Sequence, residues 1–161
     1  MNDISPRMLA VLAGLGSAAL LAAAFTFQSL GYAPCELCIL QRWPHVAAAL
    51  IALAIWFLGW SRWLAVLGLA AAGVAVGLAL YHVGVEYRWW PGPSHCSGGV
   101  GNLATMSTQD LMTQLQSAPV VRCDEVQWRL FTLSMAAWNM LCSAGLLVIW
   151  GLSARHSRAA G

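Results

Sequence analysis

The sequence has very little charge. Only 9% of its 161 residues are Asp, Glu, Lys or Arg, whereas hydrophobic residues make up 60%. An ordinary soluble domain carries about 25% charged residues, so this composition excludes that class and favours a membrane protein. The formal net charge is only +2, which gives no indication of a nucleic-acid partner.

Four long stretches have no charged residue at all, namely 8–35, 43–61, 63–85 and 130–154. A helix needs roughly 20 predominantly apolar residues to cross about 30 Å of hydrocarbon. We therefore predict an all-α membrane protein, a four-helix transmembrane bundle with helices near 8–30, 43–60, 64–86 and 130–152. These helices leave no room for a separate soluble domain, so residues 1–161 are predicted to form a single domain.

The first stretch does not have the features of a cleaved signal peptide. The apolar region of a signal peptide has roughly 7–15 residues, and this one is longer. The residues before it include Asp3 and Arg7, which cancel, so the usual positive charge is missing. We expect this segment to stay in the protein as the first membrane helix.

Four helices would place both termini on one side of the membrane, joined by loops at 31–42, 59–63 and 87–129. The arginines do not orient this arrangement, because four fall on each side: Arg7, Arg62, Arg155 and Arg158 against Arg42, Arg88, Arg122 and Arg129.

The cysteines orient the chain better than the arginines do. Four of the five lie in the two loops of the same side: Cys35, Cys38, Cys96 and Cys123. Disulfides rarely persist in a reducing cytosol. We therefore predict that loops 31–42 and 87–129 face the periplasm and that both termini are cytoplasmic. The fifth, Cys142, falls within the last helix and is interpreted as a small buried hydrophobe.

Smaller motifs predict local features. The segment Ser107-Thr-Gln-Asp110 resembles a capping box, and apolar residues follow it. It predicts a short helix in the long loop, which either lies flat on the membrane or is an ordinary amphipathic turn. Gly73 and Gly77 form a G-x-x-x-G pattern, which predicts close packing of the third helix. Gly14 and Ala18 offer a similar small-residue face on the first.

The Cys35-Glu-Leu-Cys38 pair, next to the second span, points to redox chemistry. Thiol–disulfide exchange needs a thiolate, and a cysteine at a helix N-terminus beside a cation has a lowered pKa. If the second helix begins at Cys38, Arg42 lies one turn further on, and both effects favour a thiolate at Cys38. Arg42 itself could hold an oxygen of a lipid-soluble ligand at the interface, or it could only snorkel to lipid headgroups.

Two other interpretations of the cysteines remain open. A zinc site would need a second pair or nearby histidines, and only His95 adjoins a cysteine, so no metal is predicted. A bridge between Cys96 and Cys123 could simply staple the loop, a stabilisation of roughly 3.5 kcal/mol in the chain-entropy model. The chain would then be a non-enzymatic membrane scaffold with structural disulfides.

Two histidines lie in the predicted spans. His82 is near the outer end of the third helix, where a polar residue inside the membrane indicates either function or a satisfied packing position. His45 falls in the first turn of the second helix and could line the same pocket.

Three segments together resemble a known family. They are Cys35-Glu-Leu-Cys38-Ile-Leu-Gln-Arg42, the Trp90-Pro-Gly-Pro93 turn ahead of Cys96, and Arg122-Cys123-Asp-Glu ahead of Trp128. The chain resembles the DsbB family of inner-membrane proteins that generate disulfides, of an alphaproteobacterial type. The resemblance implies a quinone-dependent thiol:disulfide oxidoreductase in the bacterial inner membrane, or a paralogue that serves a dedicated partner.

The resemblance also implies roles for the loop cysteines. Cys96–Cys123 would be the disulfide attacked by a periplasmic thioredoxin-fold oxidase of the DsbA type, with Cys96 forming the mixed disulfide. Cys123 would pass the electrons to Cys35. The long loop is more compact than the best-known pattern, which affects partner specificity.

At the membrane end the resemblance implies a quinone site. Cys38, as a thiolate, would contact a bound ubiquinone or menaquinone, and Arg42 would hold a quinone oxygen. His45 and His82 are added to this site as expected neighbours of the cofactor. The quinol would rejoin the membrane pool and be reoxidised by the respiratory chain.

Overall fold

The computed structural model describes residues 5–93, 96, 107–109, 112 and 121–155. Within these residues, four helical segments are long and apolar enough to cross a membrane. They are α1 (Pro6–Ser29), the joined pair α2 (Glu36–Leu40) and α3 (Arg42–Leu58), α4 (Arg62–Glu86) and α6 (Met135–Arg155). The predicted four-helix membrane bundle is confirmed.

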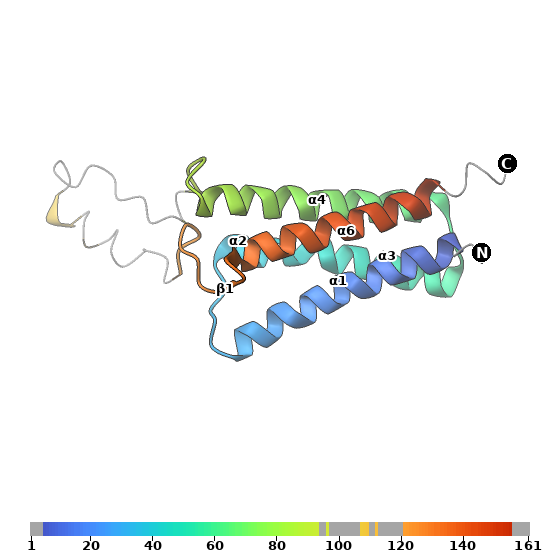
Figure 1. The fold of residues 1–161 in the computed structure, drawn as a ribbon, viewed down its shortest axis with the longest axis horizontal. Coiled ribbons are helices and arrows are strands. Elements are labelled where there is room, and N and C mark those ends of the chain that lie inside the picture. Colours follow the sequence, from blue (N-terminus) through green and yellow to red (C-terminus); the bar gives the residue numbers. More distant parts are fainter. Residues whose placement is uncertain (1–4, 94–95, 97–106, 110–111, 113–120, 156–161) are drawn as a thin grey trace.

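The helices run side by side, and α1 begins at the same end of the bundle at which α6 finishes (Figure 1). Helix α4 packs on α6, α1 packs on α3, and the pairs α3–α4 and α1–α6 complete the ring. Towards its C-terminal end α1 inclines away from the other three helices (Figure 1). The two ends of the bundle therefore differ in how closely the helices approach.

The second span begins earlier than predicted. Helix α2 begins at Glu36, and Cys35 is its N-cap, whose sulfur accepts a hydrogen bond from the Cys38 backbone N–H. A cysteine is not among the residues that usually mark a helix start, so the cap was not recognised. The chain runs on through Gln41 into α3, which ends at Gly59, a glycine with a φ of 92°.

The last span begins later than predicted. Residues 129–134 form a small antiparallel hairpin, β1 (Arg129–Leu130) and β2 (Leu133–Ser134), in place of the first helical turn. Phe131 and Thr132 at its tip both have positive φ values, as a tight hairpin turn requires. Ser134 then caps α6, because its hydroxyl accepts a hydrogen bond from the Ala137 N–H.

Close packing uses different glycines from those predicted on α4. A side chain at Gly68 would overlap the indole of Trp150, and one at Gly14 would overlap Ala52. Gly77 has no neighbour within 4 Å of an added Cβ, and Gly73 meets one atom at 3.9 Å, so the expected G-x-x-x-G interface is wrong. The bulk of Trp150 requires small residues on the face of α4 that it contacts. On α1, Gly14 is confirmed but Ala18 is exposed.

Most of the predicted short helix near 107–115 lies outside the described residues.

Candidate active site

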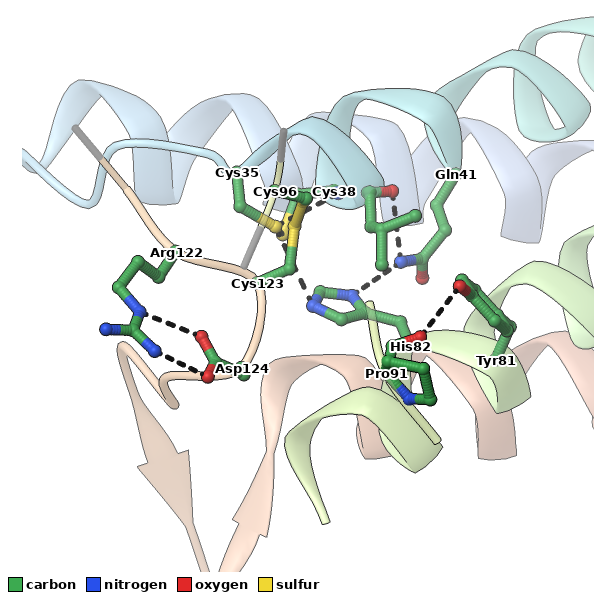
Figure 2. The surroundings of a disulfide bond; sticks show 11 residues. Cys35, Cys38, Gln41, Tyr81, His82, Pro91, Cys96, Arg122, Cys123 and Asp124 are labelled. Atoms are coloured by element: carbon green, nitrogen blue, oxygen red, sulfur yellow. Dashed lines mark hydrogen bonds and ion pairs between the residues drawn. A yellow bond between two sulfur atoms is a disulfide. The ribbon is translucent and has the colours of Figure 1, made fainter. Parts of the chain in front are cut away.

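The four loop cysteines predicted to act together meet at one end of the bundle. Cys35 and Cys38 are free thiols with their Sγ atoms 3.1 Å apart, and Cys96 is bonded to Cys123 in a disulfide. The Sγ atoms of Cys35, Cys96 and Cys123 all lie within 4.8 Å of one another. Figure 2 draws these side chains together with Cys38. The two pairs therefore form one sulfur cluster within reach of thiol–disulfide exchange.

The disulfide is buried. Cys96 is 1% exposed and Cys123 is 0% exposed, and both pack with Leu37 and Val85. The Cys123 backbone N–H donates to the Cys96 carbonyl at 2.9 Å, which ties the two loop segments together. A thiolate of another protein could therefore attack this bond only after the packing around it has opened.

The surroundings of Cys35 favour a thiolate there, whereas the sequence predicts one at Cys38. The pKa of Cys35 is lowered to about 4, chiefly by the hydrogen bond with the Cys38 side chain. Burial opposes the shift, and a hydrogen bond from His82 adds to it. The difference follows from the earlier start of α2, because Cys35 occupies the N-cap that was expected further along the chain.

A cavity of about 210 Å³ adjoins the cluster. All the site residues predicted within or beside the spans line it: Cys35, Cys38, Arg42, His45 and His82. Apolar side chains of α1, among them Leu20 and Phe27, form one wall, and Trp128 and Trp138 contribute from the hairpin side. The cavity is thus an apolar space with a few convergent polar groups, as ligand sites usually are.

Arg42 is held at the edge of this cavity. Its Nη1 donates to Gln28 Oε1 at 2.8 Å, and its guanidinium carbon lies 4.7 Å from the ring centre of Phe25. Its Nε is buried and has no hydrogen-bond partner among the described residues. One N–H donor is therefore available beside an apolar wall.

A buried polar network was missed by sequence reasoning. Gln41 Nε2 lies 2.8 Å from His82 Nδ1, and Asn139 Nδ2 donates to Gln41 Oε1 at 2.7 Å. Asn139 Oδ1 lies 3.2 Å from His45 Nε2, and Ser143 Oγ lies 3.4 Å from the same nitrogen. Asn139 and Ser143 are four residues apart inside an apolar span, which is a pattern that could have identified them.

Cys142 is not buried as the sequence analysis predicted. It is an exposed free cysteine, and it lines the same cavity as the redox pair. Residues i and i+3 share one face of a helix, so Cys142 follows the polar face that Asn139 begins.

His82 also bears on metal binding. The ligand atoms of Cys35, Cys38 and His82 all lie within 4.8 Å of one another, a set that zinc can use. In the sequence only His95 adjoins a cysteine, so His82 was not predicted as a metal ligand. Its proximity to Cys35 and Cys38 depends on how α4 packs against α2.

An ion pair orders the segment after the disulfide. Arg122 donates to both carboxylate oxygens of Asp124, at 3.0 and 2.7 Å (Figure 2). These bonds lower the pKa of the Asp124 carboxyl. Arg122 also lines the cavity, so one member of the pair is part of the cavity wall.

The comparisons with known proteins agree with this geometry. A model of the family "Disulfide bond formation protein DsbB" matches residues 6–153. Curated relatives named "Disulfide bond formation protein B" include one from Xanthomonas oryzae pv. oryzae (strain MAFF 311018), 35% identical over 87% of this chain and 84% of its own length. Another, from Verminephrobacter eiseniae (strain EF01-2), is 32% identical over 98% of this chain and 92% of its own length.

No solved structure gives a significant match. The family match covers nearly the whole chain and includes all four cysteines of the cluster. This chain is therefore a membrane-spanning member of the DsbB family of disulfide bond formation proteins, and it belongs with the disulfide oxidoreductases.

Proposed function

We propose that this protein reoxidises a periplasmic thioredoxin-fold thiol oxidase of the DsbA type and passes the electrons to membrane quinone. The observation that carries this proposal is the single sulfur cluster, in which Cys35 lies within 4.8 Å of both disulfide sulfurs and 3.1 Å from Cys38. A structural staple needs no second dithiol beside it.

The exchange steps balance in electrons and bonds. A thiolate of the reduced partner attacks Cys96, forming an intermolecular disulfide and releasing Cys123 as a thiolate. The second partner thiol displaces Cys96, so the partner leaves oxidised and the loop pair is reduced. Cys123 then attacks Cys35 of an oxidised Cys35–Cys38 bond and releases Cys38 as a thiolate. Cys96 next attacks Cys123 and releases Cys35 as a thiolate. The loop disulfide is restored, and the electron pair stays on Cys35 and Cys38.

The cavity fits a quinone. Its apolar wall suits a lipid-soluble ring, and the orphaned Arg42 Nε–H offers a donor for a carbonyl oxygen. A bound quinone would supply an acceptor for two electrons and two protons. Arg42 would orient it, the Cys38 sulfur would face it, and His45 and His82 would limit its position. Ubiquinone and menaquinone both meet these requirements.

The same proposal places loops 31–42 and 87–129 in the periplasm and both termini in the cytoplasm. Reporter fusions near Gly101 and at Gly161 test it. The first should be active only in the periplasm and the second only in the cytoplasm. The reverse pattern would place the cysteines in a reducing compartment and contradict the proposal.

The proposed exchange is tested by trapping. In a Cys123→Ala variant whose Cys35–Cys38 pair is oxidised, the free Cys96 thiol attacks an oxidised partner, and no free thiol of Cys123 or Cys35 is present to displace it. We expect a covalent adduct on non-reducing gels that disappears with reductant. Cys142→Ala serves as the control and should trap nothing.

Two results would contradict the proposal. If Cys123→Ala traps no partner, and the wild-type cysteines keep fixed redox states in the presence of excess reduced partner, the disulfides are structural. The chain would then be a membrane scaffold. A DsbA-type protein that fails to react while another periplasmic thiol protein is trapped would indicate a paralogue with a dedicated partner.

A further inference from the structure

A continuous line of polar side chains crosses three helices and ends at the redox cysteines. It runs from His45 on α3 to Asn139 on α6, back to Gln41 at the α2–α3 junction, and on to His82 on α4. His82 Nε2 lies 3.7 Å from the Cys35 sulfur. The two histidines are 4% and 3% exposed, and Asn139 is half-buried at the cavity.

One backbone carbonyl fixes the direction of every hydrogen bond in this line. Gln41 Nε2 lies 3.1 Å from the Leu37 carbonyl oxygen, which can only accept, so the atom facing it must be the amide nitrogen. The other hydrogen of that nitrogen points to His82 Nδ1 at 2.8 Å (Figure 2). His82 Nδ1 is therefore an acceptor, and the neutral ring carries its proton on Nε2.

The same assignment extends to the other end of the line. Gln41 Oε1 must accept, and it does so from Asn139 Nδ2. Asn139 Oδ1 then faces His45 Nε2, which must donate. Every N–H in the line therefore points towards Cys35. Hydrogen bonds arranged head to tail polarise one another, so the last donor is stronger than an isolated imidazole N–H.

We propose that Gln41, Asn139 and His45 are positioning residues that hold His82 in its Nε2–H form and aim that hydrogen at the Cys35 sulfur. This deepens the proposed function, because Cys35 leaves Cys123 as a thiolate in the last exchange step, and a stabilised thiolate leaves faster. His82 supports the thiolate as a neutral donor, and no buried imidazolium is required.

His82 shares the Cys35 sulfur with other hydrogen-bonding groups, and it also hydrogen-bonds to the Cys123 backbone. On α2, the Cys38 side chain and its backbone N–H also hydrogen-bond to the sulfur. On α4, Glu86 makes its hydrogen bond with Ser134. From the loop, Cys96 and Cys123 are in a disulfide and do not titrate. Zinc binding at Cys35, Cys38 and His82 is the competing role, and it needs an Nε2 lone pair that this tautomer does not have.

The proposal is tested by the pH dependence of Cys35 alkylation. The protein carries Cys142→Ala, keeps the loop disulfide and has a reduced Cys35–Cys38 pair. Iodoacetamide modification of Cys35 is located by mass spectrometry between pH 3 and pH 9. We expect a wild-type midpoint well below that of a free thiol, because three hydrogen bonds reach the Cys35 sulfur. Removing a hydrogen bond to a charged group should raise it by about one unit in Gln41→Leu and somewhat less in Asn139→Leu.

Two further variants distinguish the orientation of the His82 N–H from a general disturbance of packing. In Gln41→Glu the ring of His82 takes up a proton from solvent at Nδ1 and donates that N–H to the carboxylate, so the imidazolium also donates from Nε2 and the midpoint should stay low. Ser153→Ala, a buried polar change on α6 outside the line, should leave it unchanged. Equal midpoints in wild type, Gln41→Leu and Asn139→Leu would overturn the proposal, as would a Gln41→Glu midpoint that rises like that of Gln41→Leu.

A measurement without any line substitution covers the case in which these variants fail to fold. Histidine ¹⁵N chemical shifts of the reduced protein should show His82 in the Nε2–H form, and an Nδ1–H form would overturn the proposal. Added Zn²⁺ should not displace that proton at stoichiometric concentration, and displacement would favour the metal site. Neither assay uses a partner or quinone. The proposal about the hydrogen-bonded line can therefore be wrong while Cys123→Ala still traps a partner. It can also be right when no partner is trapped.

Discussion

The two ends of the bundle are built from the same four helices but handle space and polarity in opposite ways. At the end where α1 begins, Trp150 fills the gap over Gly68 with its Nε1 left without a hydrogen-bond partner among the described residues, and Ser153 is satisfied locally. Ser153 Oγ donates to the Pro6 carbonyl at 2.7 Å and accepts from Trp60 Nε1 at 3.2 Å. At the cysteine end a cavity remains, and the polar groups join into a line that leads to one sulfur. Small residues let the helices pack closely at the end where α1 begins. At the cysteine end, polar side chains on facing helices lie beside the cavity.

The largest effect should come from removing a sulfur at the open end. Cys38→Ala should abolish turnover with quinone while the loop disulfide still accepts one electron pair from the partner. The Cys38 side chain is the first cause of the low Cys35 pKa, so its loss should also raise that pKa and shift alkylation of Cys35 to higher pH. A stopped assay on non-reducing gels gives the first result, and the alkylation profile gives the second. Residual turnover comparable to wild type would remove Cys38 from the relay.

Substitutions at the end where α1 begins should lower the stability of the protein and leave the reactivity of Cys35 unchanged. Gly68→Leu forces a side chain into the space of Trp150, and overpacking of this kind costs about 1–3 kcal/mol. Thermal unfolding in detergent should show the loss, while Cys35 alkylation at low temperature stays as in wild type. Gly77→Leu is the matched control, because an added side chain there meets nothing within 4 Å. Equal melting temperatures for the two variants would contradict the packing described for α4 and α6.

Arg42 tests the edge of the cavity. Arg42→Lys keeps the charge but loses the planar fork and the Nε–H donor. We expect a rise of about tenfold in the apparent KM for quinone, equivalent to one lost hydrogen bond of roughly 1.4 kcal/mol, with exchange at Cys96 largely intact. Steady-state kinetics with varied quinone and with varied partner separate the two. Unchanged quinone kinetics would make Arg42 a headgroup anchor.

Cys142 should show the smallest effect, although it faces the cavity. Cys142→Ala leaves the cavity open and should change kcat and the KM for quinone by less than about twofold, within the usual range of a neutral substitution. Cys142→Trp should raise that KM, because the cavity that it lines would be partly filled. An inactive Cys142→Ala variant would place a fifth cysteine in the electron path.

Sequence alone was sufficient for what depends on composition and on order along the chain. The four charge-free stretches identified the spans, and the positions of Cys35, Cys38, Cys96 and Cys123 identified the chemistry. Sequence alone was insufficient where the rotation of a helix about its axis decides which side chains face one another. Gly68 rather than Gly77 carries the close contact because Trp150 faces it. The polarity of the line from His45 to Cys35 depends on a single carbonyl, that of Leu37, which no residue pattern reveals.

The burial of the Cys96–Cys123 bond has a consequence for selectivity in time. Small thiols diffuse freely but bring no binding energy with which to open a packed loop, so they meet this oxidant only during rare local openings. Under the proposed function, a folded partner would expose the bond by docking and so gain access that small thiols lack. Burial would then reserve the oxidising bond for one class of thiol protein.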